Sequence, residues 1–214
     1  ATQKLKPAKY PSFSLDEERK GEIIDLVHES GRDVPLSKVR FEDGSISFIP
    51  APLGTRVGQR ISFGLNSEII DGNVISIQNI PDGTIVCNVE KQFGDGGSFI
   101  KTAGADATVF SHADDGVILK LASGKFKKLN PKNRAMIGTL AGGGVEDRPF
   151  MRAGVKMMRF KSKGQKYPIV RGVAQAAYVH PHGGGRHQHV GQSSTVSRDT
   201  PPGAKVGSIA AKKT

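Results

Sequence analysis

The sequence predicts a mainly β protein, in which two sets of short strands are followed by a long, irregular, basic extension. Strand-like segments recur about every 8–12 residues between turn signals, and no long helical pattern interrupts them. The C-terminal part is instead rich in glycine and basic residues and carries no apolar periodicity. With 214 residues, the chain has room for one or two domains that each bury a modest core.

The first set of strands is expected after an N-terminal arm. Gln3 to Ser14, with Pro7 and Pro11, is interpreted as an arm and not as part of a core. Glu42-Asp43-Gly44 is a hairpin signal, and Pro81-Asp82-Gly83 marks a second turn. The expected strands, which would form a small barrel or sandwich, are 21–28, 36–41, 45–49, 60–65 and 73–77.

A second set of strands indicates another small barrel of about 70 residues. Asp114-Asp115-Gly116 and Ser123-Gly124-Lys125 are turn signals, and Asn130-Pro131 is typical of a cap and first residue that open one helical turn. The expected strands are 84–89, 98–102, 107–111, 117–121, 125–129 and 135–140.

Charge is divided unevenly along the chain. Residues 1–118 hold 12 basic and 17 acidic side chains (net −5), whereas residues 119–214 hold 19 basic and 3 acidic ones (net +16). A solvated surface accounts for a single lysine run, but a basic segment of this length favours a polyanion as partner. Residues 156–214 interleave their bases with small and aromatic residues, so we expect an extension that becomes ordered against that partner.

Composition argues against several classes of protein. A single cysteine, Cys87, excludes an internal disulfide within the chain and a cysteine-based zinc ribbon. No apolar run approaches the ~18 residues of a membrane-spanning helix, and residues 1–20 have no apolar signal region. We therefore expect no membrane association and a reducing compartment.

Four of the six histidines, His180, His182, His187 and His189, lie within ten residues. Two His-x-His pairs could chelate zinc or nickel. A glycine-rich loop imposes no metal geometry, however, and no acid closer than Asp199 can orient the rings. In this charged context we favour contacts with bases, ribose or phosphate, and we expect no metal and no cofactor.

Catalysis is not expected either. Cys87 lies in an apolar run, which indicates a structural thiol. The glycines 142–144 and 183–185 lack the Lys-Ser/Thr that completes a phosphate-binding loop. Carboxylates for acid–base chemistry are scarce in the basic half, so we predict that the chain is not an enzyme.

A series of motifs in a specific order resembles the universal large-subunit ribosomal protein family "L-two", and its archaeal and cytosolic eukaryotic branch in particular. The resemblance runs from about Gly21 to Thr214. The motifs that carry it are Ile80–Glu90, Gly94–Gly97, Asn133–Gly138, Pro149–Gly154, Arg171–Ala174, His180–Gly185, His187–Gly191 and Arg198–Gly207.

This resemblance implies an architecture and a set of partners. It implies an arm (1–19), an OB-fold barrel (20–83), an SH3-like barrel (84–155) and an extension threaded into ribosomal RNA (156–214). It also implies a structural, non-enzymatic role beside the peptidyl transferase centre, in assembly, subunit association and translation. The expected partners are large-subunit rRNA, other ribosomal proteins and the small subunit, on cytoplasmic ribosomes.

Charge and resemblance together indicate which residues bind RNA. The predicted contacts are Arg134, Arg152, Lys156, Arg159, Lys161, Lys163, Lys166, Arg171, His180, His182, Arg186, His187, His189, Arg198, Lys205, Lys212 and Lys213.

One departure from the family pattern qualifies the resemblance. Related sequences carry Met-Asn-Pro-Val and an acid before the loop histidine, whereas this chain has Gln175 to Val179 there. We therefore expect His180 to position RNA and not to transfer protons. The alternative function is a free translation factor that pairs OB and SH3-like barrels and binds RNA.

Overall fold

The computed structural model describes residues 7–11, 18–65, 67–113 and 115–212. The chain divides into two compact units, Ala1–Gly164 and Gln165–Thr214. The first unit contains a ten-stranded sheet with the strand order β3-β2-β1-β4-β5-β10-β6-β7-β8-β9. A mainly β fold with an irregular C-terminal part is therefore confirmed.

Strands β1 to β4 form the first part of this sheet. Their bounds are Arg19–Val27 (β1), Leu36–Phe41 (β2), Ile46–Pro50 (β3) and Arg60–Gly64 (β4). β1 pairs antiparallel with both β2 and β4, and β2 pairs with β3. The predicted hairpin turn is present between β2 and β3: Gly44 has a φ of 78°, and Asp43 accepts hydrogen bonds from both the backbone N–H and the hydroxyl of Ser45.

Strands β6 to β9 form the other end of the sheet. Their bounds are Ile85–Cys87 (β6), Ala107–Ala113 (β7), Gly116–Leu121 (β8) and Phe126–Leu129 (β9), and consecutive strands pair antiparallel. The strand expected at 98–102 is absent, because the chain makes only an isolated bridge between Val89 and Phe99 before Ile100 turns to a φ of 56°. The helical turn expected after Asn130 is a hydrogen-bonded turn.

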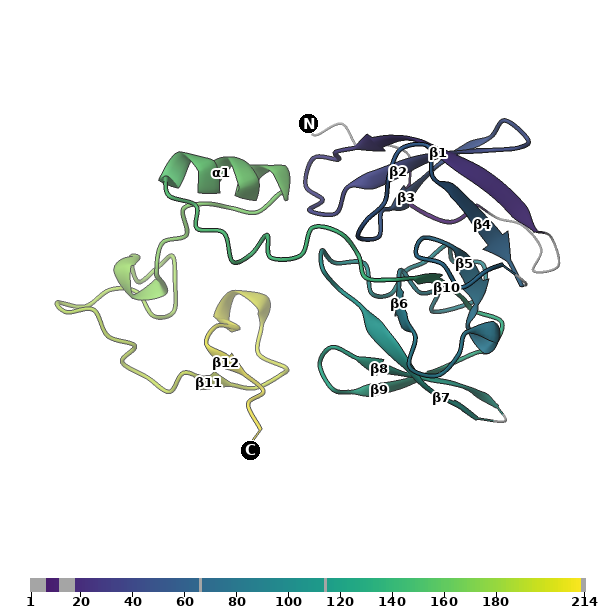
Figure 1. The fold of residues 1–214 in the computed structure, drawn as a ribbon. Coiled ribbons are helices and arrows are strands. Elements are labelled where there is room, and N and C mark those ends of the chain that lie inside the picture. The colour runs from purple at the N-terminus through teal and green to yellow at the C-terminus, as the bar shows by residue number, and fades with distance from the viewer. Residues whose placement is uncertain (1–6, 12–17, 66, 114, 213–214) are drawn as a thin grey trace. The chain divides into compact units, whose positions relative to one another are not determined.

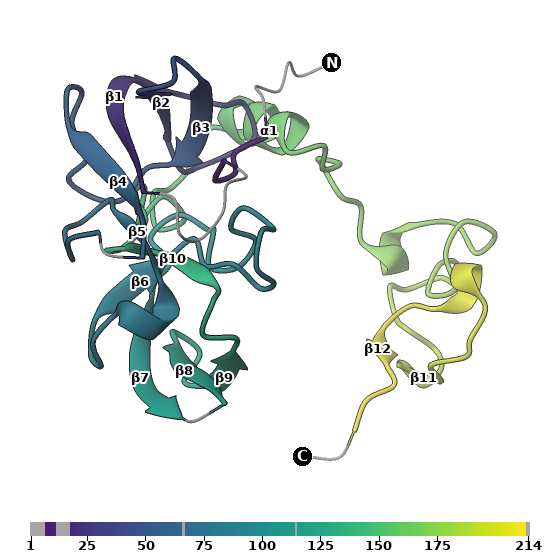
Figure 2. The same cartoon turned by 90° about the vertical axis from the view of Figure 1, so that its right-hand side faces the viewer.

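Two strands from distant parts of the sequence join these ends (Figures 1 and 2). β10 (Arg134–Ile137) lies between β5 (Val74–Ser76) and β6 and pairs antiparallel with both. The boundary expected between residues 83 and 84 separates β1–β5 from β6–β9. β10 follows this boundary in the sequence but pairs with one strand from each group. The 3-10 helix η1 (Ile77–Asn79) follows β5 directly.

The joining strands contribute to two hydrophobic cores. Side chains on a strand alternate between its faces, and neighbouring residues here fall in different clusters: Val74 and Ile75 on β5, and Ala135 and Met136 on β10. The first cluster also contains Ile23, Val39, Phe41, Ile61 and Phe63, and the second contains Ile80, Val86, Val109, Val117 and Leu119.

The N-terminal segment 7–11 is part of this packing, which corrects the expectation of an arm outside the core. Tyr10 is buried in the first cluster, its hydroxyl donates a hydrogen bond of 2.5 Å to the backbone oxygen of Asn88, and Ala8 bridges to Phe48. Lys101 Nζ donates to the backbone oxygen of Ala8 at 2.9 Å. The remainder of the expected arm, residues 1–6 and 12–17, lies outside the described residues.

The expected basic extension begins within a helix that the sequence pattern did not predict. Helix α1 (Ala153–Ser162) closes the first unit, and the boundary expected between residues 155 and 156 falls inside it. The second unit contains only short elements: η2 (Gly172–Ala174), β11 (Thr195–Val196), η3 (Pro202–Ala204) and β12 (Ser208–Ile209). Among the described residues, none of the helices has both the length and the apolar character that a membrane crossing requires.

Candidate nucleic-acid interface

Fifteen of the seventeen predicted contacts lie between Arg152 and Lys212, and each of these fifteen is exposed or partly exposed. Five of them, Arg152, Lys156, Arg159, Lys161 and Lys163, belong to the first unit at or beside α1, and the other ten belong to the second unit. Lys213 lies outside the described residues.

Arg134 differs from the others and is a correction to the predicted surface. It is a buried residue of β10, with 2% of its surface exposed, and its Nη2 lies 2.5 Å from Glu90 Oε1. Its Nη1 donates to the backbone oxygen of Pro11. The motif that contains Arg134 marks a position in the interior, where the guanidinium neutralises a buried carboxylate.

The segment that carries the other contacts has no core. Leu140 is the last buried residue in the described part of the chain, and none of residues 141–212 is buried. These 72 residues include twelve lysines and arginines but only three acids. A segment that buries no apolar side chain gains little free energy from folding alone.

Helix α1 presents a row of cations that are fixed by neighbouring side chains. Lys156 Nζ lies 5.7 Å from the ring centroids of both Phe150 and Phe160, and the guanidinium carbon of Arg159 lies 5.6 Å from that of Phe150. Such cation–π contacts orient long basic side chains. Asp33 binds two of these cations, at 3.3 Å from Arg159 and 2.7 Å from Lys163.

The histidine loop of the second unit is ordered by close contacts. His180 Nδ1 accepts a hydrogen bond of 3.0 Å from the backbone N–H of His182, and the two rings stand edge to face at 5.1 Å. A Cβ atom on Gly172 would lie 2.3 Å from the His180 ring, so only glycine allows this approach. The absence of a side chain at Gly172 therefore permits this position of the His180 ring, in which Nδ1 serves as a hydrogen-bond acceptor.

The loop histidines do not converge on a common point. His189 Nδ1 lies 2.6 Å from the backbone oxygen of His187. Throughout the described ranges, no three His, Cys, Asp or Glu side chains gather in a way that could hold a metal ion.

The thiol of Cys87 is poorly suited to nucleophilic chemistry. Cys87 is buried on β6, and desolvation by burial, together with the carboxylates of Asp106 and Asp71, raises its pKa to about 12. A thiol attacks as its thiolate, so this side chain remains protonated and unreactive near neutral pH.

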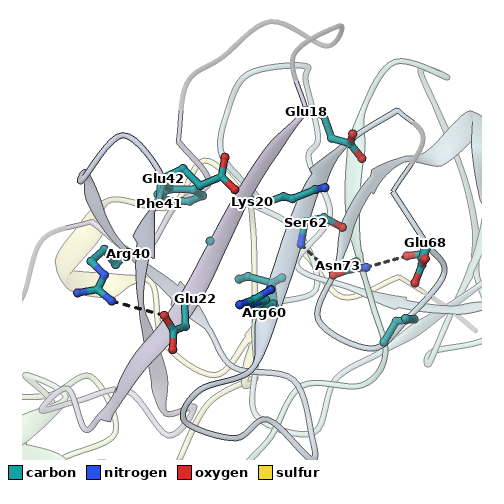
Figure 3. Close-up of a pocket in the computed structure, with 13 residues that line it drawn as sticks. Glu18, Lys20, Glu22, Arg40, Phe41, Glu42, Arg60, Ser62, Glu68 and Asn73 are labelled. Atoms are coloured by element: carbon teal, nitrogen blue, oxygen red, sulfur yellow. Dashed lines mark hydrogen bonds and ion pairs between the residues drawn. The ribbon is translucent and has the colours of Figure 1, made fainter.

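A hollow of about 630 Å³ over β1, β2 and β4 has a different charge pattern from the basic segment (Figure 3). Arg40 and Glu22 pair across it at 3.4 Å, and Asn73 links the Ser62 backbone N–H to the Glu68 backbone oxygen. Four acids line it, against only three bases: Glu18, Glu22, Glu42 and Glu68, with Lys20, Arg40 and Arg60. Such mixed charge does not match a polyanion.

Sequence reasoning missed two exposed groups near the predicted contacts. Arg148 lines a hollow with Phe150 beside α1. Its position directly before Pro149, the first residue of a family motif, was the sequence signal for this group. The edge strand β9 exposes Phe126, Lys127 and Lys128, and Phe126 packs edge to face on Phe110 at 4.9 Å. The close spacing of lysines in that strand was the signal for this second group.

A long segment with this excess of exposed basic residues is the electrostatic signature of a nucleic-acid-binding protein. The family model described as "Ribosomal Proteins L2, C-terminal domain" matches residues 70–203. The chain belongs to this family of ribosomal proteins, which confirms the resemblance drawn from the motifs.

Similar proteins extend this match over the whole chain. "Large ribosomal subunit protein uL2" of Cenarchaeum symbiosum is 74% identical over 213 residues, covering 100% of this chain and 88% of the relative. The protein of that name from Nitrosopumilus maritimus is 76% identical, covering 97% and 85%. The one from Sulfolobus acidocaldarius is 44% identical, covering 99% and 88%.

Proposed function

We propose that the chain is a structural, non-enzymatic constituent of the large ribosomal subunit and binds large-subunit rRNA through residues 141–212. The observation that carries this proposal is the combination of strong positive charge with the absence of any buried residue in that segment. RNA supplies both the counter-charge and the surface against which such a segment becomes ordered. Membership of the family supports the ribosome as the source of that RNA.

The finer location rests on the family resemblance. It puts the second unit beside the peptidyl transferase centre, in contact with other ribosomal proteins, and gives the chain a role in assembly and in association with the small subunit on cytoplasmic ribosomes. Within this proposal the loop that holds His180 contacts RNA, and His180 has a positioning role.

Sedimentation on sucrose gradients separates this proposal from that of a free translation factor. A tagged copy of the chain, expressed in Nitrosopumilus maritimus, should sediment with the large subunit even when the salt concentration of the gradient is raised. The reason is that many phosphate contacts are buried in the assembled particle. Release at moderate salt, together with a pool of free protein, would favour the factor.

Crosslinking tests the location within the particle. A photo-reactive residue at Arg186 should crosslink to rRNA around the peptidyl transferase centre, whereas the same residue at Glu68, in the mixed-charge hollow, should not reach it. Crosslinks from Arg186 to other regions of the rRNA would refute the location and leave the RNA-binding role intact.

A further inference from the structure

We propose that the hollow beside the start of α1 receives one unpaired nucleotide of the bound RNA, with its base against the apolar wall and its phosphates at the arginines of the rim. This deepens the proposed function and rests on it. The hollow has a volume of about 710 Å³, within the ~300–1,000 Å³ of typical small-molecule sites. It is lined by Gly143, Gly144, Val145, Arg148, Pro149, Phe150, Met151, Arg152, Val155 and Arg159.

The composition of this wall matches a nucleotide. Val145, Pro149, Phe150 and Val155 supply an apolar surface, and the Phe150 ring is held by the cations of Lys156 and Arg159. Bases stack on aromatic rings without regard to sequence, and single-stranded or bulged nucleotides are the ones whose faces are available for it. A paired duplex presents no free base to such a wall.

The charge at the rim matches a phosphate backbone. Arg148 and Arg152 are exposed and form no ion pair with a described residue. α1 has no acid in its first turn, and its cap residue Arg152 makes no side-chain capping bond. Glu146 and Asp147, the acids closest in sequence, line a neighbouring hollow together with Asp33 and Lys163, and Gly144 and Val145 lie between the two hollows. The rim is therefore cationic and suits an anion.

Backbone strain at the same place supports a binding role. Met151 has a φ of 56°, a backbone conformation that residues other than glycine rarely adopt. The backbone N–H of Arg152 donates a hydrogen bond of 2.5 Å to the backbone oxygen of Phe150 and so closes a tight turn around Met151. Met151 is 88% exposed, so no core contact accounts for the strain. Strained residues of this kind cluster at ligand-binding sites, and this turn sets Phe150 and Arg152 on the same hollow.

Chemical probing of RNA bound to the full chain tests the inference. Large-subunit rRNA from Nitrosopumilus maritimus is bound by the wild type, Val155→Trp and Phe150→Leu, and the reactivity of each base is read with dimethyl sulfate and a carbodiimide. Val155→Trp would fill the hollow with an indole, and Phe150→Leu would remove its aromatic face, while both variants keep every charge. Val57→Trp is the matched control, because Val57 is exposed to a similar extent and lies away from the hollow.

The expected result is one unpaired base that the wild type and Val57→Trp protect and that becomes at least about tenfold more reactive with both hollow variants, while the remaining footprint is unchanged. Protection of all the same bases by Val155→Trp or by Phe150→Leu would overturn the nucleotide site and leave the proposed function standing. A wild-type chain that protects no nucleotide would overturn the proposed function and the site with it.

Discussion

Glu90 and Arg134 form an ion pair inside the first unit, with Arg134 Nη2 2.5 Å from Glu90 Oε1 and the two side chains 0% and 3% exposed. Glu90 also accepts the backbone N–H of Arg134 at 3.0 Å and that of Gly96 at 3.1 Å. One carboxylate thus ties β10 to the segment that follows β6. The pair fixes the strand on which the two ends of the sheet meet.

Removing the charge of Glu90 should destabilise the protein strongly. Glu90→Gln keeps the shape of the side chain but leaves the Arg134 guanidinium as a buried charge without its counter-ion, which costs about 3–5 kcal/mol. Urea unfolding followed by circular dichroism measures the loss. Glu22→Gln is the control, because its pair with Arg40 is half exposed and should contribute at most about 1 kcal/mol. Equal losses in the two variants would contradict this account.

Stability should fall at alkaline pH because of a buried thiol. Burial raises the pKa of Cys87 from 9.0 to about 12, so the folded state keeps a proton that the unfolded state loses. The free energy of unfolding is therefore highest below about pH 9 and decreases as the pH rises towards 12. Burial also raises the pKa of Tyr10, which acts in the same direction. Urea unfolding from about pH 7 to about pH 11 should give a shallower decline for Cys87→Ala than for the wild type. Parallel declines would refute the role of the thiol.

We expect Asp33 to lower the RNA affinity of the protein, because it pairs with two basic side chains that would otherwise contact phosphate. It lies 2.7 Å from Lys163 Nζ and 3.3 Å from Arg159 Nη2. Asp33→Asn releases both side chains to phosphate, so RNA affinity should rise, and the plot of log affinity against log salt should steepen by up to about 1–2 units. Asp43→Asn, which removes the acid paired with Arg19 in the hairpin, should leave the slope unchanged. An unchanged slope for Asp33→Asn would show that these two cations make no phosphate contact.

The first hairpin was predictable because local sequence signals determine both of its parts. The run from Leu36 to Phe41 alternates in hydrophobicity and ends at Glu42-Asp43-Gly44, and both the strand and the turn are present. Helix α1 escaped prediction because it has no buried residue and no capping side chain, so neither amphipathic spacing nor a cap marks it.

Contacts between residues that lie far apart in the sequence could not be predicted from local patterns. The insertion of β10 between β5 and β6 joins segments about 50–60 residues apart, and the burial of Arg134 depends on that insertion. Because Arg134 is a basic residue in a motif of the basic half, the sequence predicts that it lies on the surface. Its burial can be inferred only when the fold shows that Glu90 lies beside it. Tyr10 was likewise assigned to an arm, because its partners lie some 50–80 residues further along.

The position of His180 should depend on the absence of a side chain at residue 172. Gly172→Ala would place a Cβ 2.3 Å from the imidazole, so the ring must move. If the loop contacts RNA, affinity should fall about tenfold, which corresponds to about 1.4 kcal/mol. Gly203→Ala is the matched control, because nothing lies within 4 Å of its Cβ, and it should bind like the wild type. Wild-type affinity of Gly172→Ala would mean that the ring position is irrelevant to binding.

Salt dependence of RNA binding tests most directly whether the basic segment without a core is the RNA-binding part. One variant carries glutamine in place of five exposed bases, Arg152, Lys161, Lys166, Arg186 and Arg198. The control carries glutamine in place of five bases of the first 118 residues, Lys20, Lys38, Arg40, Arg56 and Arg60. Each lost phosphate contact flattens the slope of log affinity against log salt by about 0.7–0.9. The account predicts flattening by about 3.5–4.5 units in the first variant and by less than about 1 in the control. Equal flattening in the two would contradict it.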